Sequence, residues 1–203
     1  MSAQPGDAQR VDARQRRTRT LLQAAALDLA AAGDIASVSV TDLARRAGVH
    51  RSTVYEHGGS ALGVLQGALA VELDALRERH LRDVEPDRVG AALHEVTRGV
   101  FEHVDRYAAI YRNLDAAAGT TLHSFLSEHF QVSTRLLIAQ ASLTIPTGVP
   151  HADPHLVEEV AVRYMADGVV GLIAVWLQDD HRGDPETALA MLEHLLPAWW
   201  PRE

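Results

Sequence analysis

Residues 39–55 constrain the fold more than any other part of the chain. They read Ser-Val-Thr-Asp-Leu-Ala-Arg-Arg-Ala-Gly-Val-His-Arg-Ser-Thr-Val-Tyr, which is two short helical patterns separated by a glycine. Ser39 and Asp42 have the spacing of a pair that caps the first turn of a helix. Gly48 stands where that helix must end and reverse, because glycine adopts a left-handed backbone without a side-chain penalty. The stretch therefore predicts a helix-turn-helix.

The two predicted helices each have an apolar and a polar face. Helical spacing places Leu43, Ala44, Ala47 and Val54 inside, and Arg51, Ser52 and Tyr55 outside. An arginine can donate a paired hydrogen bond to guanine, hydroxyls can meet base edges or phosphates, and Tyr55 and His57 could donate to backbone oxygens. The outer face therefore suits the DNA major groove. Spacing alone also allows a plain surface hairpin in an all-helical protein.

The motif has a recognisable pattern, Leu43-Ala44-x-x-Ala47-Gly48-Val49-x-x-x-Thr53-Val54-Tyr55-x-His57. Over residues 17–69 the chain resembles the tetracycline-repressor (TetR) family of bacterial regulators. The resemblance implies an N-terminal three-helix DNA-binding domain and a C-terminal helical domain that binds a small effector and forms a homodimer. It implies a transcription regulator, more often a repressor than an activator, that leaves a palindromic double-stranded DNA operator when the effector binds.

The sequence departs from the family pattern just after the motif. Gly58 and Ala61 stand where the family usually has an aromatic residue and a lysine. One interpretation is that the glycines at 58 and 59 merely lengthen a hinge. The main alternative is a TetR-shaped protein that binds a ligand or a partner and has lost operator binding.

Composition and charge agree with a helical DNA-binding protein. Of 203 residues 47% are hydrophobic and only 5% aromatic, which favours packed helices, and the absence of cysteine excludes disulfides and cysteine-ligated metals. Residues 1–60 hold eight arginines against six acidic residues, whereas residues 61–203 hold eleven against twenty-one. The positive half is thus the one with the motif. The sequence has neither a secretory signal nor an apolar run of membrane length, so we expect a cytoplasmic protein with no membrane contact.

Helical patterns divide the chain into about nine helices and no strands. Residues 1–13 are polar, carry Pro5 and Gly6 and predict a disordered arm. Residues 14–60 predict the DNA-binding domain, and residues 61–203 the effector-binding and dimerisation domain. The helices are expected at 12–32, 39–47, 50–57, 61–83, from 86, around 107–119, at 120–143, 154–178 and 185–197. The arginine run that starts at Arg10 is either a solvated helix start or a phosphate contact.

The last two helices carry more apolar surface than one chain needs. Residues 154–178 combine a long apolar run with small residues that permit close approach. In the family the last two helices pair with those of a second copy. We therefore predict a dimer interface, with burial within a single chain as the alternative. Its expected residues are Gly168, Gly171, Val175, Leu192 and Leu195.

Candidate sites follow from the motif and the resemblance. Eleven histidines are scattered without metal-ligand spacing, and the sequence has no phosphate loop, nucleophile elbow or dinucleotide fingerprint. We therefore expect no metal, no cofactor and no enzyme activity. The predicted DNA-binding residues are Arg17, Ser39, Thr41, His50, Arg51, Ser52, Thr53, Tyr55, His57 and Ser60. The resemblance implies an effector pocket, for which His94, Thr97, Tyr107, Tyr111, His123, Phe125, Arg163 and Asp167 are candidates, although the same set fits an ordinary core.

Overall fold

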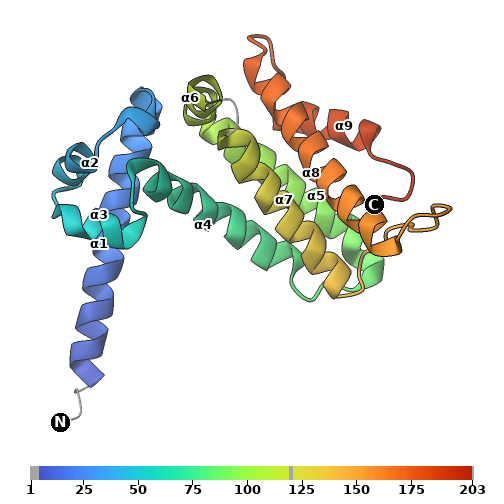
Figure 1. Cartoon of the computed structure of the whole chain (residues 1–203), viewed down its shortest axis with the longest axis horizontal. Helices are drawn as coiled ribbons and strands as arrows, with labels where there is room; N and C mark the ends of the chain where they lie inside the picture. Colours follow the sequence, from blue (N-terminus) through green and yellow to red (C-terminus); the bar gives the residue numbers. More distant parts are fainter. Residues whose placement is uncertain (1–4, 119–120, 203) are drawn as a thin grey trace. The chain divides into compact units, whose positions relative to one another are not determined.

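The computed structural model describes the backbone of residues 5–118 and 121–202, and the side chains of residues 13–115 and 123–202. All regular elements in these residues are helical, as predicted (Figure 1). The α-helices are α1 (Pro5–Ala32), α2 (Val40–Ala47), α3 (Arg51–His57), α4 (Ala61–Leu81), α5 (Val89–Arg106), α6 (Ala108–Ala118), α7 (Thr121–Ala139), α8 (Pro154–Gln178) and α9 (Pro185–Leu195). Two short 3-10 helices, η1 (Ile35–Ser37) and η2 (Pro86–Arg88), lie between them.

The chain forms two compact units, Met1–Val71 and Glu72–Glu203. The boundary between the two units falls inside α4, whereas the sequence pattern predicted a domain boundary at the start of that helix. One continuous helix thus begins in the first unit and ends in the second.

Helix α1 begins earlier than expected. The prediction of a disordered arm over 1–13 is wrong for residues 5–13, which are the first turns of α1, and residues 1–4 lie outside the described residues. Proline is well suited to the first turn of a helix because its missing N–H has no partner there in any case. The residues that follow Pro5 include alanine, glutamine and arginine, which favour helix.

The first unit is held together by a small apolar core. Leu22 and Ala26 on α1, Leu43 on α2, Val54 on α3 and Leu65 on α4 are all fully buried. Helix α2 packs on both α1 and α3. The predicted inner face of the helix-turn-helix is therefore confirmed, and it fixes which side of α3 remains outside.

The second unit packs α5 to α9 around larger side chains. Phe101 on α5, Tyr111 on α6, Leu126 on α7 and Ile173 on α8 are fully buried. Helix α7 lies along α8, and α5 packs on α9 (Figure 1). This arrangement leaves a cavity between the helices, which is described below.

Two predicted helix boundaries in the second unit were wrong. Pro86 begins η2 rather than α5, which starts at Val89. Helix α7 ends at Ala139 rather than Leu143, because Ala141 takes a left-handed backbone with φ of 56°. The amides of residues 142 and 143 then both donate to the carbonyl of Leu137.

Helix α8 is apolar along most of its length. Asp153 caps it by accepting from the amide of His155 at 3.0 Å, and Pro154 is its first residue, as predicted. By length and composition it could cross a membrane, and among the described residues the bent pair of α3 and α4 passes the same test if it is taken as one span. The core helix of a soluble protein passes the same test, and eight α8 side chains are buried within the second unit.

Candidate nucleic-acid interface and ligand cavity

Helix α2 begins at a capped serine. The hydroxyl of Ser39 accepts from the amide of Asp42 at 3.1 Å and donates to its carboxylate at 2.6 Å. This confirms the predicted cap, although the carboxylate accepts from the serine hydroxyl instead of from the Ser39 amide. Hydrogen bonding to Ser39 and the neighbouring Arg45 lower the pKa of Asp42. The anionic side chain also suits the positive end of the helix dipole.

The turn between α2 and α3 has the predicted geometry. Gly48 takes a left-handed backbone with φ of 67° and ψ of 35°. The amide of Val49 donates to the carbonyl of Ala44 at 3.0 Å, which satisfies a carbonyl at the end of α2. His50 precedes α3 without a side-chain cap, as its chemistry predicts.

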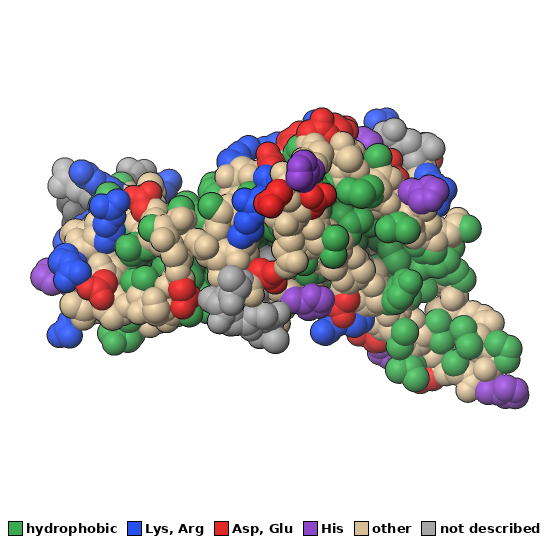
Figure 2. Space-filling model, turned by 90° about the horizontal axis from the view of Figure 1, so that it is seen from above, with side chains coloured by type: hydrophobic (Ala, Val, Ile, Leu, Met, Phe, Trp, Pro, Cys, Tyr) green, Lys and Arg blue, Asp and Glu red, His purple; other side chains and the backbone are tan. Residues whose placement is uncertain are grey.

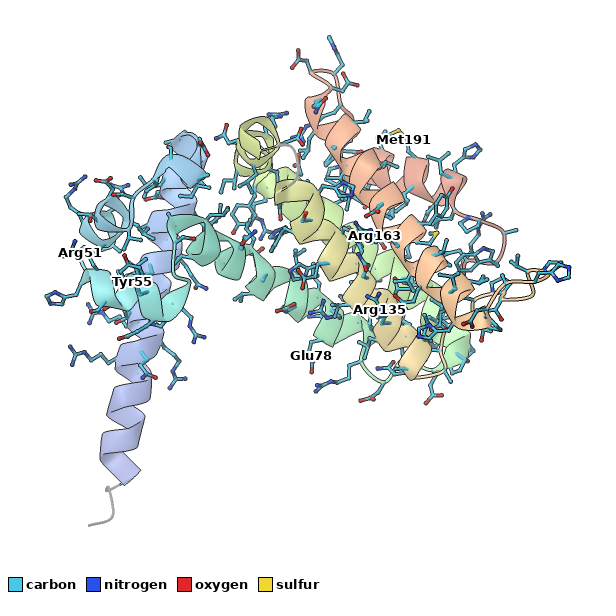
Figure 3. All side chains as sticks on the ribbon, in the orientation of Figure 1. Arg51, Tyr55, Glu78, Arg135, Arg163 and Met191 are labelled. Atoms are coloured by element: carbon cyan, nitrogen blue, oxygen red, sulfur yellow. The ribbon has the colours of Figure 1, made fainter. Side chains whose placement is uncertain are left out.

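Helix α3 presents its polar side chains outward (Figure 3). Arg51, Ser52 and Tyr55 are exposed, and Tyr55 has 65% of its surface accessible. Of the other predicted DNA-binding residues, Arg17, Ser39, Thr41, His50 and Ser60 are exposed, and Thr53 and His57 are partly buried. All ten lie in the first unit.

Ion pairs distinguish the arginines of the helix-turn-helix. Arg45 pairs with Asp42, and Arg46 pairs with Asp28 of α1 at 2.8 Å. Arg51 makes no ion pair with any residue that the structure describes. Arginine side chains stand out on the surface of the first unit (Figure 2). Arg51 is therefore the arginine of this motif that is available to a ligand.

The junction between α3 and α4 is a close backbone crossing. A Cβ atom at Gly58 would lie 2.6 Å from the amide nitrogen of Val64, and one at Gly63 would meet the carbonyl of Gly58. The hydroxyl of Ser60 accepts from the amide of Gly63 at 3.0 Å, so the predicted cap of α4 is present. Ala61 is buried. Gly58 is thus required by this geometry and is not simply a longer hinge.

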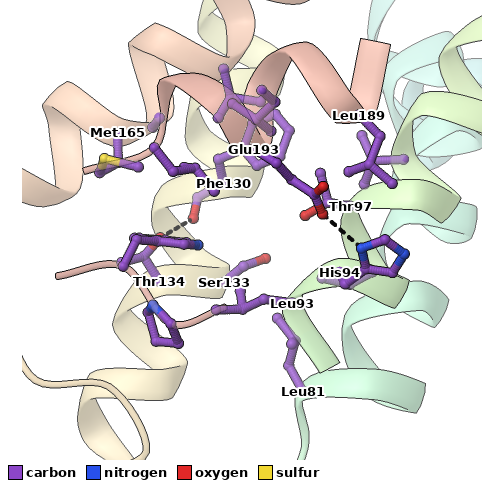
Figure 4. A pocket seen from close by; sticks show the side chains of 18 of the residues that line it. Leu81, Leu93, His94, Thr97, Phe130, Ser133, Thr134, Met165, Leu189 and Glu193 are labelled. Atoms are coloured by element: carbon purple, nitrogen blue, oxygen red, sulfur yellow. Dashed lines mark hydrogen bonds and ion pairs between the residues drawn. The ribbon is translucent and has the colours of Figure 1, made fainter. Parts of the chain in front are cut away.

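A cavity of about 530 Å³ lies inside the second unit. Its walls are mostly apolar and come from α4, α5, α7, α8, α9 and the segment after α9. Figure 4 shows Phe130, Ser133 and Thr134 on one side and His94, Thr97 and Glu193 on the opposite side. Cavities of this size and character typically hold small ligands.

The cavity contains two of the eight predicted effector contacts, His94 and Thr97. Sequence reasoning missed its polar residues Arg77, His129 and Ser133. The last two lie at helical spacing after Phe125 and Leu126, so polar residues on an apolar stripe were the signal that could have found them. The other six candidates do not line the cavity: Tyr107, Tyr111, His123, Phe125, Arg163 and Asp167.

Tyr107 and Tyr111 instead belong to a polar network around Glu72. The hydroxyl of Tyr107 donates to Glu72 Oε1 at 2.8 Å, and His103 Nδ1 lies 3.0 Å from Glu72 Oε2. Because a carboxylate only accepts, His103 donates from Nδ1, and its Nε2 accepts from the Tyr111 hydroxyl at 2.8 Å. Burial lowers the pKa of His103 and raises that of Tyr111. These side chains hold α4, α5 and α6 together.

Asp167 is also occupied within its own unit. It accepts from Ser127 at 2.6 Å, from His123 at 3.1 Å and from Arg163 at 2.7 Å. Burial opposes ionisation of Asp167, but these hydrogen bonds outweigh it and lower its pKa. Arg163 and Asp167 line a shallow groove between α8 and α9 rather than the cavity.

One face of α8 is apolar and uncovered. Its side chains have exposed fractions of 60% (Leu156), 59% (Val160), 73% (Tyr164) and 72% (Val175). Gly168 and Gly171 are exposed on the same helix, and Leu195 of α9 is 70% exposed. Hydrophobic side chains gather on the visible face of the second unit (Figure 2). Burial of this stripe within one chain, the alternative above, is therefore wrong.

Leu192 is less exposed than the other predicted dimer contacts. It is 7% exposed and lines the cavity, and it also lines the groove between α8 and α9 together with Tyr164 and Leu195. Its role as a dimer contact stays a prediction. No group of three histidine or acidic side chains is placed to hold a metal ion within residues 13–115 and 123–202.

Comparisons with known proteins agree with this architecture. A family model for bacterial regulatory proteins of the tetR family matches residues 22–60, which span the helix-turn-helix. A comparison with curated proteins gives no match.

Solved structures of bacterial regulators, TetR-family members among them, share the fold. A transcriptional regulator from Streptomyces coelicolor has 24% identity and a TM-score of 0.56, over 87% of this chain and 79% of that one. The repressor AlkX of a Dietzia strain, implicated in the biodegradation of n-alkanes, has 20% identity and a TM-score of 0.51, over 87% and 92%. The fatty acid degradation regulator FadR of Bacillus halodurans has 15% identity and a TM-score of 0.55, over 92% and 97%. The helix-turn-helix region thus matches the model of the tetR family of bacterial regulatory proteins, and the chain has the fold of solved regulators of that family.

Proposed function

We propose that this protein is a transcriptional repressor that binds a palindromic operator as a homodimer and releases it when a small effector binds. The observation that carries the proposal is α3, a well-positioned helix whose outer face holds Arg51, Ser52 and Tyr55. Arg51 would read a guanine, with Ser52 and Thr53 beside it. Ser39, Thr41, Tyr55 and His57 would hold the backbone, together with Arg17, His50 and Ser60.

The exposed stripe on α8 supports the dimer. Leu156, Val160, Tyr164 and Val175 are spaced so that they lie along one side of the helix. A contiguous apolar patch of this kind marks an interaction surface. A second copy of the chain would cover it, with Gly168, Gly171 and Leu195 in the contact, and would supply a second reading head for a half-site about 34–36 Å away.

The cavity supports an effector. A ligand there would favour a conformation of the dimer in which the two α3 helices do not fit successive major grooves. The ligand must therefore bind that conformation more tightly than the DNA-bound one. We place the protein in the cytoplasm, where it meets DNA, and assign it no catalytic step.

DNA binding provides the first test. We would measure affinity for labelled DNA from upstream of the protein's own gene, at two salt concentrations and against random competitor. We expect tight, competitor-resistant binding that falls steeply with salt. Binding no better than to random DNA, also after selection from a randomised pool, would favour the alternative of a ligand- or partner-binding protein without an operator.

Two variants separate base reading from backbone contact. Arg51→Ala should weaken operator binding by about tenfold or more and relax sequence preference, since a bidentate arginine contact contributes about 1–3 kcal/mol of discrimination. Tyr55→Phe should weaken all DNA sequences alike. Arg79→Ala, an exposed arginine in the second unit, is the control and should change neither. Equal loss on operator and random DNA for Arg51→Ala would contradict its base-reading role.

A further inference from the structure

The lining of the cavity is opposite in charge to the unit that contains it. The second unit holds eleven arginines against twenty-one acidic residues. The described lining residues, in contrast, include two arginines and three histidines but one acidic residue, Glu193. An interior that is richer in hydrogen-bond donors and positive charge than its surroundings suits a ligand with an anionic group.

The donors gather at one corner, formed by Arg77 on α4 and His129 on α7, which we call the basic corner. The Arg77 side chain is 18% exposed and that of His129 is 19% exposed. Both line the cavity, whereas Asp74, the ion-pair partner of Arg77, is not among the lining residues. Asp74 contacts one guanidinium nitrogen, and a guanidinium has five N–H donors in all. The basic corner therefore has donor capacity left for a ligand.

Glu193, the acidic residue among the described lining residues, is already satisfied. Its carboxylate lies 2.7 Å from His94 Nδ1, and its side chain is 46% exposed, so it is both hydrogen-bonded and solvated. Most of the other lining residues are apolar, with Leu93, Phe130 and Met165 among them (Figure 4). The second arginine of the lining, Arg202, is exposed and donates to the carbonyl of Leu196 at 2.9 Å. The basic corner is thus the more buried polar anchor beside a largely apolar surface.

We propose that the effector is an apolar monocarboxylic acid, with its carboxylate on Arg77 and His129 and its hydrocarbon part along the apolar walls. This rests on the proposed function only in treating the ligand as an effector. Arginine is the side chain best suited to a carboxylate, because its planar fork can donate two parallel hydrogen bonds. Ser133, one helical turn after His129, adds a hydroxyl beside the corner.

The charge balance of the basic corner predicts that the acid binds together with a proton. Burial lowers the pKa of His129 and outweighs the opposing effect of Asp74, whose Oδ1 lies 3.6 Å from His129 Nδ1 and also pairs with Arg77, so the imidazole is neutral in the empty cavity at neutral pH. The other charged or titratable groups that face it are His103 on α5 and Glu128 on its own helix, while α8 contributes apolar Met165, Ala166 and Val169 to the cavity. A carboxylate beside His129 favours the imidazolium. Affinity should then rise as the pH falls through the pKa that His129 has in the complex.

Calorimetry with three probes of equal chain length tests the ligand class. We would titrate the full-length protein with decanoate, 1-decanol and decylamine. We expect decanoate to bind most tightly, and its binding to take up a proton, seen as a heat that depends on the ionisation enthalpy of the buffer. Arg77→Gln should weaken decanoate by about tenfold or more and leave decanol almost unchanged. His129→Gln should abolish the proton uptake, and Arg79→Gln, on the same helix but outside the lining, should change nothing.

Each contrary result would overturn the proposal in a recognisable way. Decanol binding as tightly as decanoate would show an apolar pocket without an anion site, and tightest binding of decylamine would move the anchor to Glu193. Operator binding is measured separately. A protein that binds its operator but no carboxylate keeps the proposed function and loses this inference, whereas one that binds decanoate without any operator keeps the inference and loses the proposed function.

Discussion

Replacing Gly58 by alanine should destabilise the first unit, because a Cβ atom has no room at the crossing of α3 and α4. A Cβ atom there would lie 2.6 Å from the amide nitrogen and 2.9 Å from Cγ2 of Val64, where ordinary contacts begin at 3.4 Å. The nearest atom is backbone, so it cannot move aside as a flexible side chain would. The start of α4 must shift away from α3 instead. Overpacking of this kind costs about 1–3 kcal/mol.

Gly67 offers the matched control on the same helix. It is exposed on α4, and a Cβ atom there would meet nothing within 4 Å. Gly67→Ala should therefore stabilise the unit by roughly 0.4–1 kcal/mol, because alanine loses less conformational entropy on folding. The two substitutions are chemically identical and are expected to have opposite signs.

Hydrogen exchange resolved by peptide is the suitable assay, because all three tryptophans lie in the second unit and global fluorescence would not report on the first. In Gly58→Ala, amides of residues 51–71 should exchange faster, by about tenfold for each 1.4 kcal/mol lost. In Gly67→Ala they should exchange more slowly. Unchanged or slower exchange in Gly58→Ala would refute the close crossing. It would also restore the interpretation that Gly58 merely lengthens a hinge.

Three further predictions follow from the contacts described above. Ser39→Ala removes the cap of α2, so its amides should lose about 1 kcal/mol of protection in hydrogen exchange, while Ser52→Ala should leave them unchanged. The melting temperature should fall as the pH drops below about 6.5, because His103 binds a proton more readily in the unfolded chain than in the folded one, where burial lowers its pKa. His103→Gln should make the melting temperature depend less steeply on pH, and an unchanged dependence would contradict this explanation. Hydrogen bonds from His103 and Tyr107 outweigh burial and lower the pKa of Glu72, so its contribution is lost only at more acidic pH. Tyr164→Glu should turn a dimer into a monomer in sedimentation, whereas Thr144→Glu, exposed in a loop, should not.

The helix-turn-helix could be predicted residue by residue because its determinants are local. A cap at Ser39, a left-handed glycine at 48 and an apolar face of Leu43, Ala47 and Val54 each act within a few residues of the chain. The start of α1 could not be predicted as securely. Pro5 and Gly6 indicate a loop, yet proline in a first turn also begins a helix, and the sequence alone does not choose between the two.

The cavity was less predictable because it depends on contacts between residues far apart in the sequence. Periodicity could have identified His103 and His129 as polar residues on apolar helix faces, but not their partners Glu72 and Asp74, which come from another helix. Tyr111 and Asp167 were plausible ligand contacts by chemistry alone. In the structure each already forms hydrogen bonds with protein side chains, and neither lines the cavity.

Helix α4 contributes residues to the crossing with α3, to the polar network around Glu72 and to the basic corner of the cavity. Gly63 lies at its crossing with α3, Glu72 joins it to α5 and to Tyr107 between α5 and α6, and Arg77 forms part of the basic corner. A carboxylate that recruits Arg77 competes with Asp74, one turn earlier on the same helix, and places charge next to His129. The ligand proposed here would therefore act directly on the helix that also belongs to the DNA-binding unit, and a rigid crossing at Gly58 and Gly63 would prevent α3 from absorbing the change locally. If effector binding releases the operator as proposed, a loose crossing would let α3 stay in the groove, so the proposed release requires both the close crossing at Gly58 and the basic corner.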